Sequence, residues 1–99
     1  MTETWAYHQL RDGAEQVTIR PRGHSMEPLI CDRERVTIRR LRDDDVLAAG
    51  DIVLSRVRGR IYLHKVTAID GQRVQISNNH GRVNGWTNRD RVVGRAVRP

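Results

Sequence analysis

Short stretches in which apolar and polar residues alternate recur along most of the chain. Residues 15–20 alternate around Val17 and Ile19, and residues 35–41 follow the same rule. A period of two residues is typical of strands that bury one face. Val, Ile and Leu supply most of the apolar positions, and Val and Ile favour pleated surfaces. Further strands are predicted over residues 52–57, 61–69, 73–76 and 91–97.

The first twelve residues follow a different pattern. Residues 3–12 predict a short helix, with Thr2 or Thr4 as its N-cap and Gly13 at its end. Elsewhere, turn-forming residues separate the strands. The Asp70-Gly71 pair indicates a hairpin with a type I′ turn. Gly59 marks a turn, and loops are predicted at residues 42–45, 78–81 and 84–85. The sum is a mainly β fold of six or seven short strands with at most one helix.

Composition narrows the class of protein. Ninety-nine residues suit one domain over residues 1–99, with residues 1–14 as an N-terminal extension and residues 15–98 as its core. No apolar run approaches the roughly 20 residues that a membrane helix needs. No secretory signal opens the chain. A single Cys31 excludes an internal disulfide. We therefore expect a soluble, cytoplasmic protein without a membrane span; its oligomeric state is left open.

The chain is basic, with a net charge of +6 and 18 Lys and Arg residues, of which Lys65 is the only lysine. Such a charge favours acidic partners, including nucleic acid. However, the arginines are spread along the whole chain, aromatic residues are few, and no DNA- or RNA-binding motif is present. A nucleic-acid partner is therefore possible but not favoured.

The candidate chemistry lies in two places. Ser25 stands in a predicted turn between Gly23 and Pro28. A serine hydroxyl becomes a useful nucleophile when a positioned base takes its proton. His64 and Lys65 are adjacent in a predicted strand, so they point to opposite faces, and only one can meet Ser25. Composition and spacing alone do not decide between a catalytic serine and an ordinary turn serine.

Four segments in order resemble one peptidase clan. Residues 23–30 read G-H-S-M-E-P-L-I and resemble the G-x-S-M-x-P box of signal peptidases and LexA-type repressors. Residues 50–54, G-D-I-V-L, resemble the strand that follows it. Residues 62–66, Y-L-H-K-V, resemble the box with the general base, and residues 92–96, V-V-G-R-A, the terminal strand. The resemblance implies a β-rich LexA/signal-peptidase-like fold, a serine nucleophile at Ser25, and a His or Lys base.

The identity of the base stays open, with a preference. Clan members commonly read K-R-V, whereas one type of signal peptidase reads H-R-V. The triplet H-K-V here aligns best when His64 takes the base position and Lys65 the arginine position. Lys65 is the alternative base, because lysine can lose a proton where arginine cannot.

The resemblance leaves the histidine without its usual acid. Relatives of the His type carry a carboxylate that orients the base, but the matching stretch here, residues 76–80, reads I-S-N-N-H. A Ser or Asn can hold the ring by a hydrogen bond without stabilising an imidazolium as a carboxylate does. Asp90 is the nearest later acid, and its participation is not favoured.

Other residues receive lesser roles. His24 and Met26 flank the serine and are candidates for contact with substrate or for the oxyanion region. Asp51 is expected to brace the start of a strand through backbone hydrogen bonds. Gly23, Pro28, Gly50 and Gly94 complete the structural positions of the boxes. His8, His24, His64, His80 and Cys31 lack the spacing of a metal site, so no metal or cofactor is expected.

These observations favour a small serine endopeptidase that cleaves a specific protein or peptide substrate. The extended substrate would lie along a sheet edge, as clan resemblance implies. An alternative from another class is a catalytically inactive relative that binds a protein or nucleic acid through its basic face. The missing acid supports this alternative.

Overall fold

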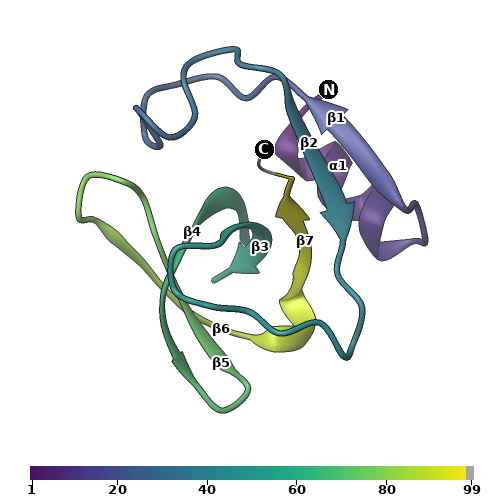
Figure 1. Ribbon diagram of the computed structural model, residues 1–99, viewed down its shortest axis with the longest axis vertical. Coiled ribbons are helices and arrows are strands. Elements are labelled where there is room, and N and C mark those ends of the chain that lie inside the picture. The colour runs from purple at the N-terminus through teal and green to yellow at the C-terminus, as the bar shows by residue number, and fades with distance from the viewer. Residues whose placement is uncertain (98–99) are drawn as a thin grey trace.

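The computed structural model describes residues 1–97, which form one α-helix, one 3-10 turn and seven strands (Figure 1). The helix and the 3-10 turn are α1 (Glu3–Arg11) and η1 (Arg89–Arg91). The strands are β1 (Gln16–Ile19), β2 (Val36–Arg40), β3 (Ile52–Val57), β4 (Arg60–Asp70), β5 (Arg73–Ser77), β6 (Val83–Asn88) and β7 (Val92–Ala96). The predicted mainly β class with one short N-terminal helix is confirmed.

The seven strands form one antiparallel sheet in the order β1-β2-β7-β3-β4-β5-β6. β7 is inserted between β2 and β3, so the last strand of the chain joins the two halves of the sheet. The sheet is strongly curved, and the Thr87 hydroxyl on β6 donates a 2.7 Å hydrogen bond to the Arg56 carbonyl on β3. α1 packs beside β1 and β2 at one end of the molecule (Figure 1).

The helix is built into the protein core. Thr2 is its N-cap, since the Thr2 hydroxyl accepts a 3.1 Å hydrogen bond from the Trp5 amide. Ala6, Tyr7 and Leu10 lie on one face and are buried against the sheet. Residues 1–14, treated above as an extension, therefore supply part of the apolar core.

Apolar residues gather on the two faces of the sheet. Ile52 and Leu54 on β3 join the cluster that contains α1, whereas Val53 and Val57 join a second cluster under β4 and β5. All four are almost fully buried. A strand buried on both faces explains why residues 52–57 read as a nearly continuous apolar run.

The box residues Gly94 and Asp51 have physical reasons for their identities. A Cβ on Gly94 would lie 2.6 Å from side-chain atoms of both Ile38 and Leu10, so only glycine lets β7 approach β2 and α1. The Asp51 carboxylate accepts hydrogen bonds from the Ala48 amide at 2.9 Å and from Arg95 at 3.2 Å. Asp51 thus ties the start of β3 to the preceding turn and to β7.

Two local predictions need correction. The sequence predicts a loop at residues 84–85, but these residues lie within β6, which is the edge strand next to β5. The β4–β5 hairpin exists, but its central residues are Gly71 and Gln72, with Asp70 still paired to Arg73. Gly71 has a positive φ of 58° while Gln72 does not, so this is not a type I′ turn.

Candidate active site

The turn that carries Ser25 is anchored at both sides. Gly23 adopts a φ of 107°, which favours glycine, and its amide donates a 2.7 Å hydrogen bond to the Asp32 carboxylate. Met26 and Ile30 are 4% exposed and hold the turn against the core. The buried side chains therefore hold the turn in place, while Ser25 stays exposed at its tip.

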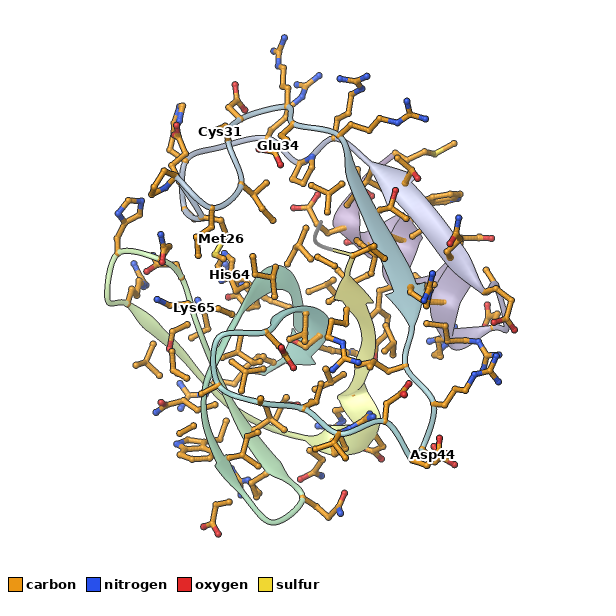
Figure 2. The ribbon with its side chains drawn as sticks, viewed as in Figure 1. Met26, Cys31, Glu34, Asp44, His64 and Lys65 are labelled. Atoms are coloured by element: carbon orange, nitrogen blue, oxygen red, sulfur yellow. The ribbon has the colours of Figure 1, made fainter. Side chains whose placement is uncertain are left out.

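Ser25 and His64 come together across 39 residues of chain. The Ser25 Oγ and the His64 Nε2 are 3.0 Å apart, within hydrogen-bond distance. His64 lies in the middle of β4, paired with Val53 of β3, and is 9% exposed. Its ring stacks on Tyr62 with 5.0 Å between centroids. Figure 2 shows Met26 beside His64, beneath the loop that carries Cys31 and Glu34.

The other ring nitrogen of His64 also has a partner. His64 Nδ1 lies 2.7 Å from the Asn84 Oδ1, an oxygen that can only accept, so the ring donates from Nδ1. In the neutral ring, this tautomer leaves Nε2 unprotonated and able to accept from the Ser25 hydroxyl. The geometry therefore places hydroxyl, imidazole and amide in one line of hydrogen bonds.

Asn84 is the residue that the sequence analysis missed. The expected ring partner lay in residues 76–80, but the contact comes from β6, four residues beyond that stretch. Val83, Trp86 and Thr87 favour strands, but the adjacent Asn84 and Gly85 favour turns, so residues 83–88 carry no clear local signal for a strand. Asp90 lies in η1 and is exposed.

Burial lowers the pKa of His64 below its ordinary value of 6.5, because the charged imidazolium loses hydration. The hydrogen bond to Asn84 and the charge of Glu3 oppose this effect and raise the pKa in part. The neutral ring is thus favoured at neutral pH. A neutral imidazole is the form that can take a proton.

Lys65 points away from this line of contacts and into another. Its ammonium donates a 3.0 Å hydrogen bond to the Asn79 side-chain oxygen. The Asn79 side-chain nitrogen in turn donates to the Glu27 carbonyl at 2.9 Å, and the Asn79 backbone N–H donates to the Ser25 carbonyl at 2.8 Å. Lys65 therefore supports the backbone of the serine turn through Asn79 rather than contacting the Ser25 hydroxyl.

The remaining box residues lie around the turn. His24 is exposed and hydrogen-bonds to Glu27, while its carbonyl accepts a 2.8 Å hydrogen bond from His80 Nε2. The Glu27–Pro28 peptide bond is cis. His80 and Asn79 thus connect residues 78–81, a predicted loop, to the serine turn.

A small cavity of about 60 Å³ opens beside Ser25 and His64. Met26 lies in its wall, as do Ile61, Tyr62 and Leu63 of β4. Glu3 at the start of α1 also lies in the wall, although no motif in the sequence links the helix to the serine. The other lining residues are Pro21, Arg22, Gly23, Ile30 and Cys31.

Two further properties concern the described residues. Within residues 1–97, no group of three or more His, Cys, Asp or Glu side chains is placed to hold a metal ion. No helix in that part of the chain is long and apolar enough to span a membrane.

The expected membership of the LexA/signal-peptidase-like clan is confirmed by a family match. The family model described as Peptidase S24-like matches residues 1–97, so the chain belongs to the Peptidase S24-like family. No curated protein and no solved structure matches it. The family therefore supports a serine-peptidase type of fold, and roles for individual residues rest on the geometry above.

Proposed function

We propose that the protein is a serine endopeptidase that uses Ser25 as nucleophile and His64 as general base. The observation that carries this proposal is the 3.0 Å contact between the Ser25 Oγ and the His64 Nε2, with Nδ1 held by Asn84. Nucleophile, base and orienting group are the parts that such catalysis requires.

The reaction follows from these positions. The Ser25 oxygen attacks the peptide carbonyl as its proton passes to His64 Nε2, giving a tetrahedral oxyanion and an imidazolium. The imidazolium then protonates the leaving amine, the C–N bond breaks, and an acyl-enzyme ester remains. Water hydrolyses the ester with His64 again acting as base, which regenerates the Ser25 hydroxyl.

The oxyanion needs a hydrogen-bond donor close to Ser25. The backbone hydrogen bonds of this turn are donated by the amides of Glu27 and Ile30. The Ser25 N–H is not used in that pattern and lies next to the reacting oxygen, which supports it as an oxyanion donor. Asn84 accepts from Nδ1 but carries no charge, so stabilisation of the imidazolium rests partly on Glu3.

Two observations support His64 over Lys65 as the base. The His64 ring contacts the Ser25 hydroxyl, whereas the Lys65 ammonium is bound to Asn79. The alignment of H-K-V with H-R-V gives the same assignment. Lys65 then has a positioning role for the serine turn.

The size of the cavity bears on the substrate. A volume of about 60 Å³ beside Ser25 suits a small side chain such as that of Ala or Ser. Resemblance to the clan also implies small residues at the cleavage point. We therefore propose cleavage of an extended peptide or protein segment next to a small residue.

A peptide library tests this proposal. Peptides containing Ala, Ser or Gly pairs are incubated with the protein, and cleavage is read by mass spectrometry. We expect cleavage next to a small residue, with loss of product in Ser25→Ala and His64→Ala. Lys65→Arg is the control that should remain active. Cleavage that persists in Ser25→Ala, or a complete absence of cleavage and of Ser25 acylation, would contradict the proposal and favour a binding role.

A further inference from the structure

A second and larger hollow adjoins the cavity beside Ser25. It has a volume of about 680 Å³ and lies between the start of α1, the end of β1 and the segment before β2. Four arginines line it. We call it the arginine groove; its lining residues are Met1, Thr2, Glu3, Thr18, Ile19, Arg20, Arg22, Arg33 and Arg35.

The positive charge of the arginine groove is poorly compensated. Among its described lining residues, Glu3 is the one carboxylate. Arg33 lies 4.0 Å from the Asp32 carboxylate, a long ion pair. Within residues 1–97, neither Arg22 nor Arg35 forms an ion pair.

The carboxylates near the arginine groove already accept hydrogen bonds from backbone amides. Asp32 accepts a 2.7 Å hydrogen bond from the Gly23 amide, and Glu34 accepts a 3.1 Å hydrogen bond from the Cys31 amide. These carboxylates hold the loop in shape and face its amides. The four arginines are exposed, so their guanidinium groups can reach a ligand.

The groove is continuous with the candidate active site. Glu3 and Arg22 line both the arginine groove and the cavity that contains Ser25 and His64. An extended peptide advances by about 3.3 Å per residue, so residues a few positions from the cleavage point can lie in the groove. The ligand that contacts the arginines can thus be part of the peptide that contacts Ser25.

We propose that the arginine groove binds acidic side chains of the substrate on one side of the cleavage point. This inference rests on the proposed function, and it adds a substrate class, a peptide with a small residue flanked by Asp or Glu. Guanidinium groups pair with carboxylates through paired hydrogen bonds. A peptide suits the groove better than nucleic acid does, because Glu3 stands inside it and no aromatic residue lines it for base stacking.

Binding can be tested apart from cleavage. The Ser25→Ala protein is titrated into fluorescent peptides that carry an Ala-Ala centre and three Glu or three Gln residues on one side, in both orientations. Each exposed ion pair contributes only modestly, so we expect three of them to make the Glu peptide bind about 10-fold more tightly in one orientation. The difference should shrink as salt is added.

Paired variants make the test specific. Arg20→Gln with Arg35→Gln should remove most of the preference for Glu. The control, Arg73→Gln with Arg91→Gln, removes the same charge from the start of β5 and from η1, at the opposite end of the molecule (Figure 1). We expect no change there. Glu3→Gln should strengthen binding of the Glu peptide, because it removes the repelling carboxylate. Circular dichroism checks that each variant is folded.

The outcomes separate this inference from the proposed function. Equal binding of the Glu and Gln peptides in both orientations overturns the arginine groove as an acidic subsite. Equal cleavage of both by the native protein overturns it as well, while leaving Ser25 and His64 as peptidase residues. Selective binding without cleavage supports the groove and contradicts the peptidase. Tighter binding of a 12-nucleotide single strand, lost in the groove variant, would assign the groove to nucleic acid instead.

Discussion

Two neighbouring residues of β4 form contacts of similar kind with different consequences. His64 and Lys65 each hydrogen-bond to an asparagine, Asn84 and Asn79 respectively. His64 also hydrogen-bonds to the Ser25 hydroxyl. Lys65 instead reaches the backbone of the serine turn through Asn79. Because adjacent residues of a strand point to opposite faces, one strand can support both the reacting group and the turn that presents it.

The two asparagines also lie in different elements and contact side chains of different burial. Asn84 lies in the edge strand β6 and contacts His64, which is 9% exposed and so has little access to water. Asn79 lies in the loop between β5 and β6 and contacts a half-buried lysine. We infer that the His64–Asn84 pair governs the chemistry and the Lys65–Asn79 pair governs the placement of Ser25.

Replacing the two β4 residues should separate these roles most strongly. His64→Gln removes the proposed base and should lower kcat by about 100-fold or more, since general base catalysis contributes factors of 10² to 10⁴. Lys65→Arg keeps a donor for Asn79 and should retain most activity. Rates on a peptide identified by the library measure both. Loss of activity in Lys65→Arg together with retention in His64→Gln would make Lys65 the base.

Substitutions of Asn84 should give the next largest effect. Asn84→Ala frees the ring to rotate and should lower kcat by up to about 100-fold, the cost of misplacing a reacting group by about 1 Å. Asn84→Asp keeps an acceptor and adds a negative charge, which raises the pKa of His64. The acidic limb of the pH–rate profile should therefore move to higher pH in Asn84→Asp. An unmoved limb would show that Asn84 does not act on His64.

Asn79→Ala should act on the serine turn rather than on the base. It removes the acceptor of Lys65 and the donor to the Glu27 carbonyl, and we expect a loss of about 1–2 kcal/mol of unfolding free energy in urea titrations. Activity should fall because Ser25 is displaced, but the apparent pKa in the pH–rate profile should remain. A shifted pKa with unchanged stability would place Asn79 in the base network instead.

The fold was largely predictable because strand periodicity is a local signal. Val17, Ile19, Val36 and Ile38 alternate in the sequence and form the β1–β2 pair. β6 was missed because Asn84 and Gly85 favour turns, and only pairing with β5 decides their conformation. The displaced hairpin at Gly71 has the same cause, since register depends on partner strands rather than on the Asp-Gly pair alone.

The candidate site was predictable only in part. Ser25 and His64 were singled out through resemblance and not through local physics, since they are 39 residues apart. Asn84 and Glu3 are brought near His64 by the pairing of β6 in the sheet and by the packing of α1. Neither is visible in residue spacing. The match of the family to residues 1–97 supports the fold but does not assign these residues.

The smallest expected effect concerns stability at mild acidity. Because the pKa of His64 is lower in the folded protein than its ordinary value of 6.5, the unfolded chain binds more protons between these two values. The contribution of His64 to the free energy of unfolding is therefore fully present above pH 6.5, and it decreases as the pH falls from 6.5 through the lower pKa of the folded protein. Urea unfolding at pH 7.5 and pH 5.0 measures the change.

His64→Gln has no such titration, so its stability should fall less over the same interval. Lys65→Arg leaves the imidazole in place and should keep the native dependence. An equal loss of stability in His64→Gln would mean that the buried ring does not cause the pH dependence. His64 and Lys65 would then differ only in their contacts with the serine turn.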